Sequence, residues 1–470
     1  MVRGKGGWLM VFKVPQRLLV LGLGTSGAAV ASWALDRAAE GADVSVTVVD
    51  SASDALVAER AAVLTARGAD VRLGSTEVVP ADLVVASPGI RPSAPVMTAA
   101  RELGVPMISE IELAYRVSVA PWIAITGTNG KTTTTALVTH LLREAGFAAE
   151  AAGNIGPPSI GVATDLGTAG VIVAEVSSFQ LMLVDRFHPR VSVLLNITPD
   201  HIDYHGSLEA YASDKARVFA RQLPGDTAVI DIDDEGSRPH ADLVEARGIR
   251  VVRVSRQSTP AGGAYVRDSV LVLHEDGAEV ALVPASELRI RGDHNVSNAL
   301  AGAAAARAMG AGIEALREGL RSFEPIEHRL EPAGTVDGVE YFNDSKATNP
   351  DAVIKALTAF GDRGIVLLLG GRNKGVAMRP LAETVSERCG AVVLFGEAAS
   401  EFEAAFAGLP IPTRTARDLA GAVGVARSFA HEGDAVVLSP GCTSFDEFGG
   451  YEERGRRFKA IVASLSGAGE

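Results

Sequence analysis

Residues 122–135 read WIAITGTNGKTTTT, and this stretch sets the fold of the chain around it. A short apolar run gives way to a glycine-containing loop, and an apolar run compatible with a helix follows from Ala136. This order of strand, loop and helix turns backbone N–H groups and a helix N-terminus towards an anion. Lys131 adds a point charge for phosphates, and Thr132 adds a hydroxyl for a magnesium ion. The stretch therefore predicts that the chain binds a nucleoside triphosphate.

The match to the phosphate-loop pattern G-x-x-x-x-G-K-[ST] is incomplete, because Ile125 stands at its first glycine and Gly127 supplies the backbone freedom instead. A threonine-rich helix cap after a turn is the alternative. The position of Gly-Lys-Thr between a strand and a helix favours phosphate binding. We expect the nucleotide to contact the whole loop, which comprises Gly127, Thr128, Asn129, Gly130, Lys131, Thr132 and Thr133.

The bulk properties favour a soluble protein of several domains. The 470 residues correspond to about three domains of roughly 150 residues each. The net charge of −13 argues against broad binding of nucleic acid or anionic membranes, and no apolar segment reaches the roughly 18 residues of a membrane span. Cys389 and Cys442 form no CxxC pair, so we expect reduced thiols, no structural zinc and a cytoplasmic location.

The N-terminal region carries a glycine fingerprint. Residues 17–27 read RLLVLGLGTSG, a strand running into G-x-G-x-x-G, and a helix over 28–39 and a strand over 44–49 follow. Asp50 then stands about where a Rossmann fold places a ribose-binding acid. Another strand, 83–86, ends in the small-residue loop SPGI. Alone, this region favours a nicotinamide enzyme, although any diphosphate-bearing ligand fits it, and a tight turn without a ligand is the alternative.

Two polar clusters follow apolar strands in the central region. Glu175 comes directly after the strand 171–174, and His201 lies in the NITPDHID segment after the strand 191–195. Open α/β sheets place ligands at the carboxyl ends of their strands, and Asn154 lies in a loop that can reach the same cleft. Glu175 is the better magnesium candidate because its ligand atom is a hard oxygen. A lone Glu or His after a strand is often an ordinary loop residue, but two in one sheet with a phosphate loop favour function.

Several later polar residues have two interpretations. Lys215 lies in a helical stretch, 208–222, and reads as a solvated lysine, because an ammonium ligates a metal only after deprotonation or modification. Residues 226–290 carry short alternating segments typical of small strands. Asn295 and Asn298 precede an alanine-rich helix, 299–309, and either cap it or bond a base or phosphate.

The last region repeats the strand, polar loop and helix unit. It begins at a break in the pattern over 323–329, where Arg329 can touch a phosphate or form a surface ion pair. Strands are expected at 339–343, 365–369, 392–395 and 435–438. The fold class is therefore α/β with three domains: a Rossmann-like domain over 1–118, a central mononucleotide-binding domain of the P-loop type with a parallel sheet over 119–325, and a Rossmann-like domain over 326–470.

Eight of these segments, taken together, resemble the Mur ligases of peptidoglycan synthesis. They are TGTNGKTT, EVSSFQ, NITPDHID, GDHNVSNA, EHRLE, NDSKATNP, LLLGGRNKG and LSPGCTSFDEF, within matches that run from about residue 17 to 460. The first five also fit the wider group of ATP-dependent amide ligases, which includes folylpolyglutamate synthetases. The last three and the N-terminal domain most resemble the branch that adds D-glutamate to UDP-N-acetylmuramoyl-L-alanine.

The resemblance implies a reaction and a set of site residues. ATP, with Mg2+, phosphorylates the terminal carboxylate of the muramoyl substrate, and the amine of D-glutamate attacks the acyl phosphate; we expect a monomer. The implied catalytic residues are Lys131, Glu175, His201, Lys215 and Lys346. The implied metal ligands are Thr132, Glu175, His201 and a carbamylated Lys215. Further ATP contacts are Asn298, Arg329 and Asp344. The UDP-muramoyl side is Thr25, Ser26, Asp50, Ser87, Gly89, Asn154 and His201. The D-glutamate side is Thr348, Lys374, Ser444 and Tyr451.

The chain departs from the family pattern at a few positions, and other functions compete with this one. Ala52 stands where the family can carry an arginine near the uracil, and Tyr451 where phenylalanine is frequent. The nearest rival is an amide ligase that adds another amino acid, for example to a folate. A nicotinamide dehydrogenase explains the N-terminal fingerprint but leaves Lys131, Glu175 and Lys346 without a function. A non-catalytic nucleotide-gated scaffold leaves the many polar loops unexplained.

Overall fold

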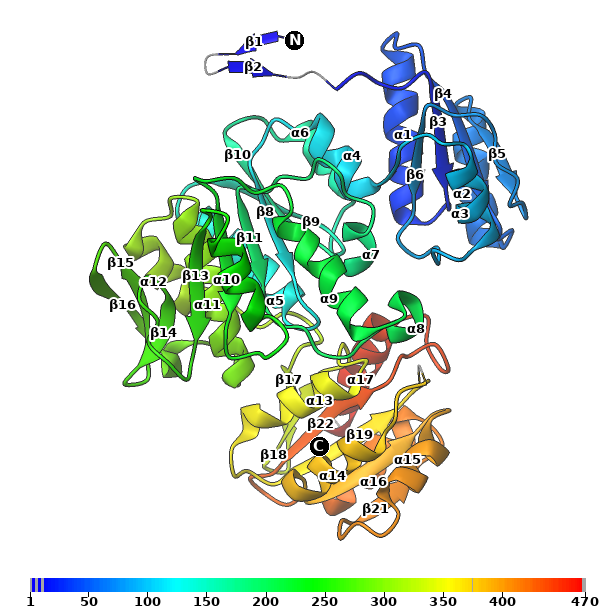
Figure 1. The fold of residues 1–470 in the computed structure, drawn as a ribbon. Helices are drawn as coiled ribbons and strands as arrows, with labels where there is room; N and C mark the ends of the chain where they lie inside the picture. Colours follow the sequence, from blue (N-terminus) through cyan, green and yellow to red (C-terminus); the bar gives the residue numbers. More distant parts are fainter. Residues whose placement is uncertain (1, 5–6, 10–11, 374, 467–470) are drawn as a thin grey trace. The chain divides into compact units, whose positions relative to one another are not determined.

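The computed structural model describes residues 2–4, 7–9, 12–373 and 375–466. The chain forms two compact units (Figure 1). Unit 1 comprises Met1–Ala285 and Ser297–Arg321, and unit 2 comprises Ser286–Val296 and Ser322–Glu470. Unit 1 holds two large α/β sheets and unit 2 holds one, which confirms the predicted fold class. The predicted domain bounds at 118 and 325 stay a prediction. Within the described ranges, no helix combines the length and the apolar character that a membrane crossing requires.

The N-terminal sheet of unit 1 is parallel, in the order β5-β4-β3-β6-β7. The order reverses beside β3, and such a switch point is where open sheets bind ligands. Helix α1 begins at Thr25, three residues before the predicted start, so the loop after β3 is shorter than expected. The strands are β3 (Arg17–Leu21), β4 (Ser45–Asp50), β5 (Asp70–Leu73), β6 (Leu83–Ala86) and β7 (Met107–Ser109). The helices are α1 (Thr25–Ala39), α2 (Ala55–Ala66), α3 (Pro95–Glu102) and α4 (Glu110–Val117); a separate hairpin pairs β1 (Val2–Gly4) with β2 (Gly7–Leu9).

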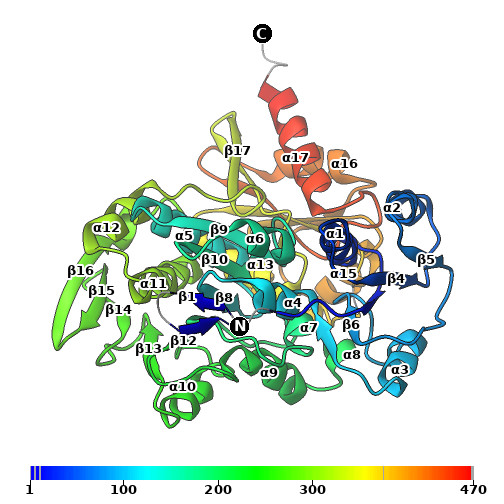
Figure 2. The ribbon, with the colours of Figure 1, turned by 90° about the horizontal axis from the view of Figure 1, so that it is seen from above.

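The central sheet of unit 1 has the order β16-β15-β14-β13-β12-β11-β8-β10-β9. It is parallel from β9 to β14, as predicted, and the last two strands add an antiparallel edge. Figure 2 shows α5 and α12 on one side of this sheet and α9 and α10 on the other. The strands are β8 (Trp122–Thr126), β9 (Ala148–Gly153), β10 (Gly170–Glu175), β11 (Val191–Leu194), β12 (Thr227–Asp231), β13 (Arg250–Ser255), β14 (Ala264–Arg267), β15 (Val270–Glu275) and β16 (Ala278–Pro284).

The helices of this region correct two sequence predictions. The interpretation of Asn295 and Asn298 as caps is wrong, because α11 begins at Asp293 and both asparagines lie inside it. The predicted helix over 208–222 is shorter, since α9 ends at Ala216 and a 3₁₀ turn follows. The helices are α5 (Lys131–Glu144), α6 (Ser159–Asp165), α7 (Ser178–Leu181), α8 (Ile202–His205), α9 (Leu208–Ala216), η1 (Arg217–Phe219), α10 (Arg238–Glu245), η2 (Ala285–Glu287), α11 (Asp293–Ala308) and α12 (Ile313–Ser322).

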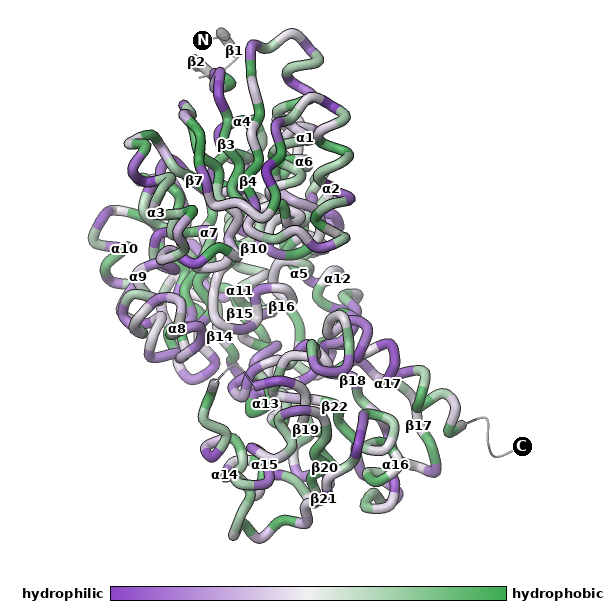
Figure 3. Tube along the Cα trace, turned by 90° about the vertical axis from the view of Figure 1, so that its right-hand side faces the viewer, coloured by the Kyte–Doolittle hydropathy of each residue, from purple (hydrophilic) through white to green (hydrophobic). Residues whose placement is uncertain are grey.

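The sheet of unit 2 has the order β17-β18-β22-β19-β20-β21 and is parallel except for the edge pair β17-β18. Its central strands are apolar throughout and are covered on both faces, which Figure 3 shows as hydrophobic stretches along β19, β20 and β22. The strands are β17 (Glu331–Val336), β18 (Val339–Asn343), β19 (Ile365–Gly370), β20 (Ala391–Phe395), β21 (Thr413–Thr415) and β22 (Ala435–Gly441). The helices are α13 (Pro350–Leu357), η3 (Thr358–Phe360), α14 (Arg379–Arg388), α15 (Ala399–Phe406), α16 (Leu419–Phe429) and α17 (Tyr451–Ser466).

Two buried carboxyl groups, Glu110 and Glu112, open helix α4 in unit 1. Glu112 accepts three consecutive backbone N–H groups of residues 185–187, at 3.0, 2.9 and 2.9 Å, and pairs with Arg116 at 2.6 Å. A carboxylate with this many donors is well compensated for its burial. Glu110 is less well provided, since its Oε1 accepts the N–H of Ile160 at 2.7 Å but its Oε2 has no hydrogen-bond partner among the described residues.

Substituting Glu110→Gln is expected to stabilise the protein at pH 8. Burial raises the pKa of Glu110 from 4.5 to about 7. Because the folded-state pKa is the higher one, the group favours folding fully below pH 4.5, and this contribution is lost as the pH rises through 7. The loss approaches about 3 kcal/mol, at roughly 1.4 kcal/mol per pKa unit. Thermal unfolding at pH 5 and pH 8 tests this, and an equal difference between the two proteins at both pH values would contradict it.

Candidate active site

The loop after β8 has the backbone of an anion-binding turn. Gly127 and Gly130 have φ angles of 155° and 83°, and α5 begins directly after Gly130. The N–H of Asn129 donates to Asn196 Oδ1 at 2.8 Å, which fixes the loop to the end of β11. A Cβ atom at Gly130 would lie 2.4 Å from Asn298 Oδ1, so only glycine fits there. The side chain of Asn298 therefore lies against the phosphate loop.

Lys131 and Lys215 converge on one carbonyl of this loop. Lys131 Nζ donates to Gly127 O at 2.9 Å and to Thr128 O at 2.8 Å, and Lys215 Nζ also donates to Gly127 O, at 2.8 Å. Lys215 is buried, and its Nζ lies 4.5 Å from the ring centroid of Tyr211. Burial, and then the nearby charge of Lys131, lowers the pKa of Lys215 well below its usual value. The prediction of a solvated helix lysine is thus wrong; this amine is buried and inclined to be neutral.

Glu175 brings a buried carboxylate to the same edge of the sheet. It is the last residue of β10 and pairs in register with Ile125 of β8, so it lies beside the phosphate loop. Its Oε1 accepts from Asn154 Nδ2 at 2.7 Å, whereas Oε2 is buried and has no hydrogen-bond partner in the described part of the chain. An orphaned carboxylate oxygen beside a phosphate loop fits a hard divalent cation. Thr132 and Thr133, in the first turn of α5, are also buried.

His201 opens a small aromatic cluster that the sequence did not reveal. It adopts a left-handed backbone (φ 51°) before α8, and its ring lies 4.9 Å from that of Phe179 and 3.6 Å, through Nε2, from Asp200. The ring of Phe179 also stacks on His205 at 5.3 Å. Tyr204, in α8, donates a hydrogen bond from its hydroxyl to the carbonyl of Ile90 at 2.8 Å, in the N-terminal sheet region.

Partly buried hydrogen bonds link the helices on either side of His205. His205 Nδ1 lies 2.8 Å from Asp214 Oδ2, and His205 Nε2 lies 3.0 Å from Ser178 Oγ. Asp214 directly precedes Lys215, so these hydrogen bonds fix the lysine helix α9 against α7. No pattern in the sequence predicts these hydrogen bonds, because they depend on the packing of α8, a helix of only 4 residues.

The N-terminal fingerprint is a closely packed turn. The carboxylate of Asp50 accepts the N–H of Leu23 at 2.6 Å and that of Ala52 at 2.8 Å, so both oxygens hold backbone in place. Ser87 Oγ donates to Gly22 O at 3.2 Å. Thr25 and Ser26 form the start of α1, with Thr25 exposed, and Gly89 is exposed in the loop after β6. The structure therefore gathers these predicted residues around one helix N-terminus.

Most predicted residues of unit 2 lie in two loops: Asp344, Lys346 and Thr348 after β18, and Ser444 after β22. Asp344 is buried, accepts from Ser439 Oγ at 2.7 Å, and has a pKa raised to about 7 by burial. Lys346 Nζ lies 4.9 Å from the ring centroid of Tyr451. Two further positions are Thr348, which is half-buried, and Ser444, which is buried. Arg329 Nε is buried without a hydrogen-bond partner in the described ranges. Lys374 lies outside the described residues.

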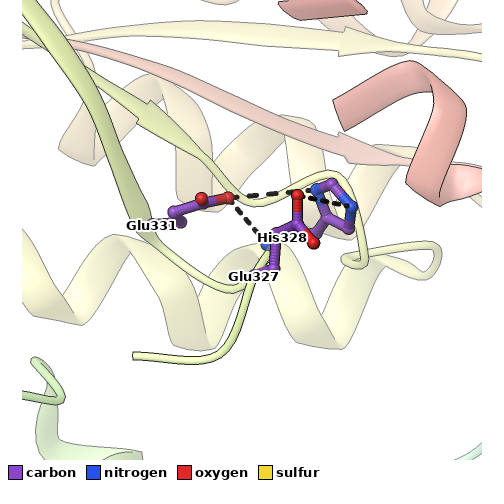
Figure 4. Close-up of side chains that lie close together, drawn as sticks. All are labelled: Glu327, His328 and Glu331. Carbon is purple, nitrogen blue, oxygen red and sulfur yellow. Dashed lines mark hydrogen bonds and ion pairs between the residues drawn. The ribbon is translucent and has the colours of Figure 1, made fainter. Parts of the chain in front are cut away.

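A histidine and two glutamates cluster next to Arg329. Figure 4 shows the carboxylates of Glu327 and Glu331 beside the His328 ring, at 3.7 and 3.9 Å from its nitrogens. Lys459 Nζ donates to Glu327 at 2.7 Å and to Glu331 at 2.8 Å. His328 Nδ1 lies 2.9 Å from Asn343 Nδ2 and accepts a hydrogen bond from this amide nitrogen. The ammonium group of Lys459 already supplies the positive charge that a metal ion would bring to the two carboxylates. We therefore interpret Glu327, His328, Glu331 and Lys459 as an ion-pair network.

Three family models match the chain in order. They are the Mur ligase MurD-like N-terminal domain at residues 16–109, the Mur ligase middle domain at 125–306, and the Mur ligase glutamate ligase domain at 328–442. A curated relative, the UDP-N-acetylmuramoylalanine--D-glutamate ligase of Pelotomaculum thermopropionicum, is 43% identical over 455 residues, which are 96% of this chain and 98% of the relative. The chain belongs to the Mur ligase family.

Other relatives of this Mur ligase agree. A second UDP-N-acetylmuramoylalanine--D-glutamate ligase, from Salinibacter ruber, is 42% identical over 96% of this chain and 98% of its own length. Among solved structures, the UDP-N-acetylmuramate-alanine ligase MurC of Thermotoga maritima has a TM-score of 0.60 at 20% identity, covering 96% of this chain and 100% of its own. At that identity the solved structure supports the fold alone.

Proposed function

We propose that this Mur ligase joins D-glutamate to UDP-N-acetylmuramoyl-L-alanine, at the expense of ATP, in the synthesis of peptidoglycan precursors. The observation that carries the proposal is the 43% identity over 96% of the chain to a ligase named for this reaction. The glycine turn of the N-terminal sheet and the phosphate loop of the central sheet support the proposal, because each has a backbone suited to an anion, and a nucleotide-linked substrate and ATP require two such sites.

The reaction consists of two steps, phosphorylation of a carboxylate and attack of an amine. A carboxylate is a poor electrophile, so its oxygen first attacks the γ-phosphorus of ATP and ADP leaves. The amine of D-glutamate then attacks the carbonyl carbon of the acyl phosphate, loses a proton, and the C–O bond to phosphate breaks. Negative charge builds on the transferring phosphoryl group, and positive side chains around it lower the barrier. We propose that Lys131, whose Nζ lies at the phosphate loop, contributes this charge.

We propose that ATP contacts two groups of residues, one at the phosphate loop and one in unit 2. The first group is Gly127 to Thr133, with Asn298 against Gly130. Arg329 and Asp344, from unit 2, are proposed as further ATP contacts, and Lys346 as a catalytic cation. The buried Nε of Arg329, which has no hydrogen-bond partner in the described part of the structure, supports a role with an added acceptor.

We propose a magnesium site beside the same loop, held by Thr132, Glu175, His201 and a modified Lys215. The orphaned Oε2 of Glu175 supports it. When bound, the ion neutralises phosphate charge. The lowered pKa of Lys215 supports the modification, since only a neutral amine attacks CO2. Its nitrogen forms a bond to the CO2 carbon and loses a proton, and the resulting carbamate offers the oxygen ligands that an ammonium cannot.

The two substrates other than ATP are assigned to separate groups of residues. For the UDP-muramoyl substrate we propose Thr25, Ser26, Asp50, Ser87, Gly89, Asn154 and His201. The N-terminus of α1, a helix of 15 residues, favours the diphosphate, and Asp50 acts by setting the loop before it. For D-glutamate we propose Thr348, Lys374, Ser444 and Tyr451. We place the enzyme in the cytoplasm, which the reduced thiols of Cys389 and Cys442 support.

Phosphate release from ATP is expected to require both UDP-N-acetylmuramoyl-L-alanine and D-glutamate. The purified full chain is assayed with each substrate omitted in turn, with L-glutamate replacing D-glutamate, and with a dihydropteroate substrate replacing the muramoyl nucleotide. Turnover with L-glutamate equal to that with D-glutamate would contradict the proposal. Phosphate release that depends on neither UDP-N-acetylmuramoyl-L-alanine nor D-glutamate would also contradict it. Saturable NADH binding, followed by fluorescence, would revive the dehydrogenase alternative.

A further inference from the structure

A fully buried arginine lies among the loops of unit 2. Arg454, in the first turn of α17, has no exposed surface. Its Nε donates to Ser345 Oγ at 2.9 Å, and its Nη2 donates to Ser345 O at 2.8 Å and to Cys442 O at 3.2 Å. Its Nη1 donates to Thr443 O at 3.2 Å. Burial lowers the pKa of Arg454 to about 10, so the guanidinium stays charged at neutral pH.

These acceptors belong to two loops that carry proposed catalytic and substrate-binding residues. Ser345 directly precedes Lys346 in the loop after β18, and Thr443 directly precedes Ser444 in the loop after β22. Ser345 Oγ also donates to the carbonyl of Tyr451 at 2.9 Å, which ties the start of α17 to the first loop. One guanidinium thus joins three segments that are far apart in sequence.

A third loop packs against the same group. Thr443 and Arg372 exchange backbone hydrogen bonds at 2.9 and 3.0 Å, which pairs the loop after β22 with the loop after β19. Gly371 has φ 109°, and a Cβ there would lie 2.0 Å from Thr443 O and 2.9 Å from Arg454 Nη1. The backbone approaches the guanidinium so closely that only glycine is accommodated.

Burying this charge is unfavourable before its hydrogen bonds are counted. The acceptors named above are hydroxyl and carbonyl oxygens, which compensate less than a carboxylate does. A lysine has no planar fork and cannot reach acceptors on two loops in the same geometry. The arrangement is therefore specific to arginine. Its hydrogen bonds hold the loops in position and do not involve the strands of the sheet.

We propose that Arg454 is a positioning residue for D-glutamate, which sets the loops after β18, β19 and β22 at the distances that hold the amino-acid substrate. The proposal rests on the proposed function. Arg454 acts through Ser345 and Thr443, which place Lys346, Thr348 and Ser444. Loss of this alignment weakens D-glutamate binding more than binding of the muramoyl nucleotide, whose proposed residues belong to unit 1.

The test compares Arg454→Lys with Arg457→Lys, an exposed position on the same helix. Arg454→Lys is expected to raise the KM for D-glutamate about 10- to 10²-fold, the effect of small displacements at a site. The KM for UDP-N-acetylmuramoyl-L-alanine should change less than about twofold in the same protein, and Arg457→Lys should resemble the wild type. Equal increases in both KM values, or an unchanged KM for D-glutamate in a folded variant, would overturn the proposal.

Two further measurements guard against a loss of folding. Ser345→Ala removes one acceptor and is expected to raise the KM for D-glutamate in the same direction with a smaller effect. Arg454→Ala should regain part of its activity when guanidinium is added far below the concentrations that unfold proteins. Absence of both effects would refute the positioning role. The D-glutamate dependence of the wild type is measured first, so a failure of the proposed function is recognised separately.

Discussion

Substituting Lys131→Ala is expected to lower ATP turnover by about 10³-fold or more while the protein stays folded. The Nζ of Lys131 lies on the phosphate loop, where it donates to the carbonyls of Gly127 and Thr128. Phosphate oxygens are stronger acceptors than these carbonyls, and the charge that grows during phosphoryl transfer strengthens the interaction further. The loss should therefore appear in kcat as well as in the KM for ATP.

The matched control is Arg143→Ala, on the exposed face of the same helix α5. Arg143 pairs with Glu150 at 2.9 Å, and both side chains are about half exposed, so this pair contributes little to stability. Steady-state phosphate release, circular dichroism and thermal unfolding are measured for both variants. Turnover near the wild-type rate in Lys131→Ala, at saturating ATP, would remove the assignment of the phosphate loop.

The apolar runs allowed the sheets to be predicted, because strands buried on both faces need continuous apolar sequence. The strand expected at 339–343 is β18 itself, and the strand at 171–174 lengthens by one residue at each end in β10. The rule that ligands gather at the carboxyl ends of strands also placed Glu175 correctly beside the phosphate loop, in register with Ile125. Local pattern was sufficient here because one strand sets the position of the next.

The rest of the site depends on tertiary packing that local sequence does not encode. Arg454 and Arg457 read alike in the segment EERGRRF, yet Arg454 is fully buried among three loops and Arg457 is exposed. Lys215 reads as a surface lysine until α9 packs its Nζ onto Gly127 O. Asp50 reads as a ribose ligand, although its oxygens hold the backbone of Leu23 and Ala52. Each of these roles follows from contacts between segments far apart in sequence.

Substituting Lys215→Ala is expected to abolish activity, and added acetate or formate is expected to restore part of it. The lowered pKa of Lys215 arises first from burial and then from Lys131, which donates to the same carbonyl of Gly127. A neutral amine at this position relieves the repulsion and is the form that adds CO2. The alanine variant leaves a cavity beside Glu175 and the phosphate loop, where a small carboxylate can supply the oxygens that the carbamate supplied.

Lys131→Ala serves as the control, because a carboxylate cannot replace a cation on the phosphates and should not rescue it. A second readout is independent of turnover: 13C NMR of the wild type in 13C-bicarbonate should show a carbamate signal that is absent from Lys215→Ala. Inactivity without rescue, together with no such signal, would contradict the modification and leave Lys215 as a buried amine. The combination separates a ligand role from a packing role, because loss of packing alone would respond neither to formate nor to bicarbonate.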